Sequence, residues 1–320
     1  MAYQNVGTPR FYINIPEWLS SNGVTSFSTQ FNTLPIKHDE SIYDLYTGLQ
    51  DNSAPSVTEN NSYPCFTALL DHSLKDYKFL VSDVGEYNEI FNWTHDTVFA
   101  FNGFSIISHQ SLPSSVSHTF SVFDAPDPYI GSIVIGVIYD MPHSADIKLT
   151  MERKMDGVKR ARTKGGYDHV GYKYIKPPSW NFMSPWEVTP PNPALGYLPP
   201  ETSRIGRRIW NLSFSYLQDS DMFPMFSSIG PYQSNHADGT ANWSEDDTWH
   251  QDNTLIDSNN FYSQVIHKTN GGQLPFIFQP DKNNNSSDGF AIAKFDQNSF
   301  KFSQQSSNLY RVSLKIREVW

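Results

Sequence analysis

Arg204-Ile-Gly-Arg-Arg-Ile-Trp-Asn-Leu-Ser-Phe-Ser-Tyr-Leu217 is the most regular segment of this 320-residue chain. From Ile209 onward its side chains alternate between two faces. One face would carry Ile209, Asn211, Ser213 and Ser215, and the other Trp210, Leu212, Phe214 and Tyr216. A period of two among aromatic and branched residues is typical of a strand that buries one face. The segment therefore predicts a strand whose tryptophan face is buried.

A helix and four strands are predicted after this segment. Residues 259–272 place Phe261, Tyr262, Val265 and Ile266 at helical spacing, with Ser258 or Asn259 as the cap and Gly271 just beyond the end. Strands are predicted at 274–281, 290–295, 299–303 and 309–320, with a turn over 283–289. A sheet with one helix on its face is a complete packing unit.

Three motifs of this region occur in a recognisable order. They are Gly-Arg-Arg-x-Trp-x-Leu-x-Phe-x-Tyr at 206–216, Gly-Gly-x-x-Pro-Phe-x-Phe-x-Pro-Asp at 271–281 behind the helix, and the antiparallel close of the chain. Together they resemble the tail-tube-like fold of the minor tail and distal tail proteins of tailed phages, over about the last third of the chain. The resemblance implies a structural protein that pairs strands around a ring, with six copies, and carries the tube to the tip.

Composition narrows the classes of partner. The net charge is −10 at pH 7, whereas a protein that binds duplex nucleic acid or an anionic membrane normally presents a strongly basic face. No window approaches the ~20 apolar residues that a membrane helix needs. Cys65 is the only cysteine, so an internal disulfide is excluded and folding in a reducing cytosol is expected. We expect no nucleic acid and no membrane insertion, and a protein made in the host cytoplasm that leaves inside a particle.

The predicted fold is mainly β, with four parts. Residues 1–62 hold a strand near 10–19, expected to return to the C-terminal sheet, and a polar loop or extended arm. Residues 63–175 hold short apolar runs about ten residues apart, typical of a jelly-roll-like sandwich, and 131–140 is apolar on both faces and so central in its sheet. Residues 176–200 are a proline-rich connector. Residues 201–320 form the tail-tube-like antiparallel sheet or barrel with one packed helix; the resemblance makes the sandwich a galectin-like module.

Two oppositely charged segments suggest a contact between subunits. Asp156-Gly157 predicts a hairpin between 148–154 and 158–164. Its arms are basic, whereas 228–257 is acidic. In a ring of identical copies such patches meet head to tail; the candidate residues are Arg153, Lys154, Lys159, Arg160, Arg162, Glu245, Asp246 and Asp247. The alternative is that the lysines only keep a strand edge from pairing with other sheets. The sequence favours neither.

Other candidate chemistry is weaker. The histidines show no metal-ligand spacing and no hydrolase or nucleotide-binding motif is present, so we expect no metal, no cofactor and no catalysis. Asp281–Asp288 offers oxygen ligands like a calcium loop, but the bidentate glutamate is missing and a turn is favoured. Carboxylate pairs for glycoside cleavage, such as Glu245 with Asp246, are a remoter alternative. Trp93, Trp243 and Trp249 are candidates for stacking on sugars, although tryptophans more often anchor cores and interfaces.

The sequence thus predicts a non-enzymatic virion protein of a tailed phage, a minor tail or distal tail component at the tip, with itself and other tail proteins as partners. The alternatives are a carbohydrate-binding host-recognition module that takes a surface glycan, and a neck or capsid component. Copies would share strand edges. A final strand enclosed in its own subunit, together with polar groups converging in a deep cleft, would contradict that interpretation.

Overall fold

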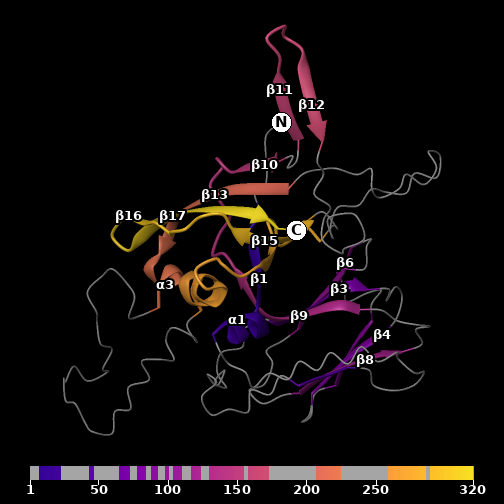
Figure 1. The fold of residues 1–320 in the computed structure, drawn as a ribbon. Coiled ribbons are helices and arrows are strands. Elements are labelled where there is room, and N and C mark those ends of the chain that lie inside the picture. Colours follow the sequence, from indigo (N-terminus) through magenta and orange to yellow (C-terminus); the bar gives the residue numbers. More distant parts are fainter. Residues whose placement is uncertain are drawn as a thin grey trace.

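The structure, a computed structural model, describes residues 7–22, 43–46, 65–72, 78–83, 88–92, 98–100, 104–109, 117–123, 130–154, 158–172, 207–224, 259–285 and 289–319. Within these residues the chain is mainly antiparallel β, as the sequence predicts (Figure 1). The connector predicted at 176–200 lies outside the described residues, and the division into domains stays a prediction.

One antiparallel sheet dominates the molecule. Its strand order is β10-β13-β17-β15-β14-β1-β9-β3-β7-β6, with β16 added beside β17. The strands are β1 Arg10–Asn14, β3 Cys65–His72, β6 Val98–Ala100, β7 Phe104–His109, β9 Ile130–Asp140, β10 Thr150–Lys154, β13 Arg207–Gln218, β14 Phe276–Gln279, β15 Ala291–Phe295, β16 Phe302–Ser306 and β17 Leu309–Glu318. The predicted centrality of β9 is confirmed, because β1 and β3 pair with its two edges.

Two smaller sheets complete the described strands. A four-stranded sheet has the order β2-β8-β4-β5, and β11 pairs with β12 alone. Their bounds are β2 Tyr43–Tyr46, β4 Lys78–Asp83, β5 Asn88–Asn92, β8 Ser117–Phe123, β11 Val158–Arg162 and β12 Asp168–Tyr172. The sequence patterns did not predict β2, which falls in the predicted arm, β5 or β12. Helical segments are α1 Ile15–Ser21, α3 Asp219–Met222, the π-helical η2 Tyr262–Ile266 and the 3-10 η3 His267–Thr269.

The N-terminal strand returns to the C-terminal sheet, which confirms that prediction, but the strand predicted near 10–19 ends at Asn14 and is followed by the helix α1. In β1, Phe11 lies opposite Phe278 of β14 on one side and Tyr139 of β9 on the other. β10, which the sequence analysis grouped with the sandwich, pairs with β13. Strand pairing therefore crosses the boundary predicted between 63–175 and 201–320, and β1 holds the two regions in one sheet.

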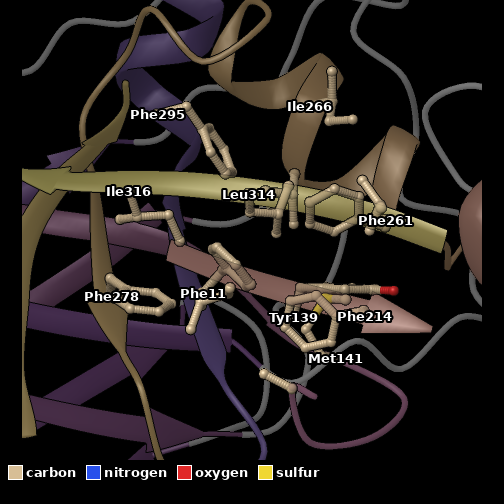
Figure 2. Close-up of a cluster of buried hydrophobic side chains, with 14 of the residues drawn as sticks. Phe11, Tyr139, Met141, Phe214, Phe261, Ile266, Phe278, Phe295, Leu314 and Ile316 are labelled. Carbon is tan, nitrogen blue, oxygen red and sulfur yellow. The ribbon is translucent and has the colours of Figure 1, made fainter. Parts of the chain in front are cut away.

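The largest core lies between the helical segment η2–η3 and one face of the sheet (Figure 2). Phe11 is at its centre: its ring centroid lies 5.9 Å from that of Phe261 and 5.3 Å from that of Phe278. Burying one such side chain contributes about 1.5–3 kcal/mol, and each aromatic pair about 0.5–1.5 kcal/mol more. This core also contains Trp210, Leu212, Phe214, Leu217, Val265, Ile266, Phe276, Phe295, Tyr310, Val312, Leu314 and Ile316.

A second core lies on the opposite face of the same strands. Because side chains alternate along a strand, β1 sends Tyr12 to this face while Phe11 and Ile13 enter the first core. The Tyr12 hydroxyl donates to Oε1 of Gln279 at 2.8 Å, which satisfies both buried groups. The other members are Phe66, Ala68, Leu70, Ile106, Ile138, Ile277 and Phe290. Around β1 the sheet is thus buried on both sides.

A β-bulge corrects the predicted alternation of β13. The register with β17 shifts between Phe214 and Leu217, and Tyr216 has a φ of +64°. The bulge inserts one residue, so Leu217 is fully buried where the alternation predicts Tyr216, and Tyr216 is 73% exposed. Upstream of the bulge the prediction holds, because Trp210, Leu212 and Phe214 are all buried.

The predicted helix at 259–272 exists but is neither a regular α-helix nor capped as expected. Its cap is Asn260, whose Oδ1 accepts the backbone N–H of Ser263 at 2.8 Å, and not Ser258 or Asn259. The helix ends at Asn270, with a φ of +50°, followed by Gly271 at +68°. The left-handed stop at this glycine agrees with the prediction.

Two further boundaries differ from the sequence expectation. The strand predicted at 299–303 begins only at Phe302, because Phe300 turns into the core, where its ring centroid lies 5.0 Å from that of Phe295. The predicted Asp156-Gly157 hairpin is wrong: β10 pairs with β13, and β11 pairs with β12 around the turn at Thr163–Tyr167. β10 thus joins the large sheet, and the turn that contains Gly165-Gly166 closes the hairpin of β11 with β12.

Candidate interaction surfaces

The hairpin β11–β12 stands apart from the other described strands and helices (Figure 1). Both of its faces are solvent-exposed at residues 159–171. Lys159, Arg160 and Arg162 lie on β11. The one ion pair recorded within the hairpin joins Arg162 Nε to Asp168 Oδ1 at 3.9 Å, with side chains 77% and 60% exposed. Such an exposed pair contributes little to stability, so these charges are not there to hold the hairpin together.

Arg153 and Lys154 lie elsewhere, which splits the predicted basic cluster in two. Both are exposed residues of β10, the strand at one end of the large sheet, opposite Arg208 and Arg207 of β13. On the described residues no strand pairs with the other edge of β10. An open edge can add a strand from another chain, and lysines on such an edge discourage that pairing. Both interpretations that the sequence left open still apply to this strand.

The acidic candidates and the sugar-stacking candidates lie outside the described residues. They are Glu245, Asp246 and Asp247 for the first group, and Trp93, Trp243 and Trp249 for the second. Their pairing with the basic residues, or with a glycan, therefore stays a prediction.

The final strand does not offer an edge to a neighbour. β17 pairs with β13 along one side, and with β16 and then β15 along the other. The final strand is therefore enclosed within its own subunit, which is the first of the two observations that would contradict the sharing of strand edges. Neighbouring copies cannot share β17. Among the described strands, the terminal members of the large sheet are β10 and β6. These two strands, together with β16, which pairs with β17 alone, are the members of the large sheet that have an edge without a described partner strand.

The outward face of β13 and β17 is polar, as the alternation predicts. Nδ2 of Asn211 donates to Oγ1 of Thr150 at 3.1 Å, and Nε of Arg311 donates to Oγ of Ser213 at 3.0 Å. Lys315 Nζ lies 2.8 Å from Asp296 Oδ2, and this contact holds the pKa of Asp296 below its ordinary value. Polar side chains on this face hydrogen-bond across the strands and are open to water. The face is therefore suited to polar contacts and not to the burial of apolar side chains.

A charge cluster ties the N-terminal strand to its neighbours. Arg10 binds Asp140 through Nε–Oδ1 at 2.6 Å and Nη2–Oδ2 at 2.9 Å, and Lys282 Nζ lies 3.2 Å from the same carboxylate. Burial alone would raise the pKa of Asp140, but the hydrogen bonds and charges of Arg10 and Lys282 outweigh it and lower the pKa. The cluster links β1, β9 and the loop after β14, so we assign it to stability and not to chemistry.

No candidate metal site emerges from the part of the chain that the structure describes, where no three His, Cys, Asp or Glu side chains come together. At the predicted turn, the backbone N–H of Asn284 donates to the carbonyl of Asp281 at 2.9 Å, and that of Asn283 to its carboxylate at 3.0 Å. These bonds form the turn that the sequence analysis preferred over a calcium loop. Of the described helices, none has the length and apolar composition to cross a membrane.

The class of protein that the fold defines is an antiparallel, mainly β chain with a helical segment packed on one sheet face. Comparison with protein-family models, with curated proteins and with solved structures gives no match to this chain.

Proposed function

We propose that the chain is a structural component of a tailed-phage virion, a ring-forming minor tail or distal tail protein at the tail tip, that carries out no reaction. The strand–helix–strand order of residues 207–319 supports this, since it matches the order on which the sequence resemblance rests. The observation that carries the proposal is the large sheet: one long antiparallel scaffold, continuous through β1, with an outer strand whose second edge has no partner among the described strands.

Assembly would use charge as well as strand edges. The basic residues of β11 are exposed, and the chain as a whole carries a net charge of −10. Opposite charges on two patches of one chain favour a head-to-tail contact, which closes into a ring when the rotation between copies allows it. Neighbouring tail proteins would occupy the remaining faces.

Locating the protein in particles tests this function. Gold-labelled antibodies against the purified chain, applied to intact phage particles from the producing host, are expected to bind at the tail tip. Labelling at the neck or on the capsid would favour the alternative virion positions. The absence of the protein from particles would contradict the proposal as a whole.

A further inference from the structure

We propose that the hairpin β11–β12 is a docking arm that binds an acidic surface of a second copy of this chain, and that the basic residues of β10 belong to the body and take no part. This inference rests on the proposed self-assembly and names the element that makes the contact.

The first argument is that the hairpin has no core of its own. Its strands pair only with each other in the described structure, and its residues 159–171 are exposed on both faces. An isolated two-stranded hairpin is marginally stable in water, and a hydrophobic face or a third packing element is normally needed. Tyr167, 69% exposed, and Val170, 39% exposed, are apolar side chains of the hairpin that a partner could cover.

The second argument is charge. Residues 158–172 contain four cations, Lys159, Arg160, Arg162 and Lys164, against one carboxylate, Asp168, which gives +3 with neutral histidine. Because the whole chain carries −10, subtracting +3 leaves −13 on the remaining residues. This opposition of charge within one chain favours another copy as the partner of the arm. Contacts of this type mainly set the rate and the specificity of encounter.

The third argument separates the arm from β10. Arg153 and Lys154 are in register with Arg207 and Arg208 of β13, within the large sheet. Lys159 and Arg160 are in register with Gly171 and Val170 of the hairpin alone. The two adjacent basic pairs therefore form a matched comparison: reversing either pair changes the net charge by the same amount, on an exposed strand in both cases.

Sedimentation velocity of the full chain tests the arm. The Lys159→Glu/Arg160→Glu variant is expected to weaken self-association by ~10-fold or more, and the Arg153→Glu/Lys154→Glu variant by less than ~3-fold. Raising the salt from about 50 mM to about 500 mM is expected to lower the affinity of wild-type self-association toward that of the arm variant. Equal effects of the two variants, or an arm variant that associates like wild type, would overturn the arm while leaving assembly intact.

Two other outcomes separate the arm from the proposed function. A wild-type chain that stays monomeric at both salt concentrations would overturn the proposed self-assembly. The wild-type measurement alone gives this result, without any variant. Binding of a short DNA duplex or of anionic vesicles that is lost in the arm variant, with self-association unchanged, would show that the arm serves a different acidic partner and would overturn the inference. Thermal unfolding of each variant confirms that the large sheet is intact.

Discussion

Arg208 and Glu318 form a buried ion pair that joins the start of β13 to the end of β17. Arg208 Nη2 lies 3.0 Å from Glu318 Oε1, and the backbone N–H of Arg208 donates to Oε2 at 2.9 Å. Their side chains are 5% and 1% exposed. Nη2 also donates to the carbonyl of Phe290 at 2.5 Å, and the guanidinium lies 5.2 Å from the centroid of the Trp210 ring.

The first prediction concerns this pair. Removing one partner leaves the other charge buried, so Glu318→Ala is expected to lower the free energy of unfolding by about 3–5 kcal/mol. Replacing both groups, as in Arg208→Met/Glu318→Leu, is expected to cost less than the single change, because no charge is then left buried. Urea unfolding followed by circular dichroism measures both. A double variant less stable than Glu318→Ala would contradict the argument.

The second prediction concerns Gly136 of β9. A Cβ at this position would lie 1.8 Å from the carbonyl oxygen of Ile13, where the chain passes from β1 into α1. Gly136→Ala is therefore expected to lower the free energy of unfolding by about 1–3 kcal/mol or to prevent folding. Gly171→Ala is the control, since the nearest atom to its Cβ would be the carbonyl oxygen of Lys159 at 4.0 Å. Equal stability of the two variants would refute the close approach.

The third prediction tests the bulge of β13. Leu217→Ser is expected to cost about 2–4 kcal/mol, because it removes a fully buried side chain and buries a hydroxyl. Tyr216→Ser is expected to change stability by no more than about 0.5 kcal/mol, since the ring is 73% exposed. Thermal unfolding distinguishes the two variants. A larger loss of stability in Tyr216→Ser than in Leu217→Ser would contradict the bulge and support the uninterrupted alternation that the sequence suggests.

The bulge shows what the sequence can and cannot predict here. Alternation along β13 and β17 identifies the buried face from Trp210 to Phe214, because a period of two is a local property. The shift at Tyr216 depends on the partner strand and is invisible in one chain segment. The pairing of β10 with β13 has the same cause. Asp156-Gly157 is a good local hairpin signal, but β10 pairs with β13 of the large sheet and β11 pairs with β12, so the basic residues are divided between two sheets.

The cap and the stop of the helical segment at 259–272 were predictable to within one or two residues. Gly271 is a stop signal that any sequence reader finds, whereas the choice of Asn260 over Ser258 or Asn259 as the cap depends on where Phe261 enters the core. The candidate residues for contact between subunits were predicted from charge alone. Charge does not show which residues lie on the same strand, so only the structure assigns Arg153 and Lys154 to the sheet edge and Lys159, Arg160 and Arg162 to the hairpin.

The fourth prediction concerns pH. Burial lowers the pKa of His267, and the charge of Lys268 lowers it further. The centroid of the imidazole ring lies 5.3 Å from that of Trp18, and Nδ1 has no hydrogen-bond partner among the described residues. A histidine whose pKa is lower in the folded state binds protons more weakly there than in the unfolded chain, so its protonation favours unfolding.

The free energy of unfolding should therefore fall as the pH drops below about 6.5, the ordinary pKa of histidine, and the loss should end below the folded-state pKa. His267→Gln is expected to remove this part of the pH dependence, with the remainder unchanged. Urea titrations at several pH values between about 7.5 and 5.5 measure the difference. If the free energy of unfolding of His267→Gln depends on pH as steeply as that of wild type, a group other than His267 is responsible for the pH dependence.

Native mass spectrometry of the purified chain tests the central claim most directly, since a ring has a fixed number of copies. The proposal predicts a single closed species at a whole multiple of 36.5 kDa, and six copies, as the resemblance implies, give about 219 kDa. The mass should not grow with concentration once the ring has closed. A protein found only at 36.5 kDa across the accessible concentrations, or as an open-ended series of sizes, would contradict the account.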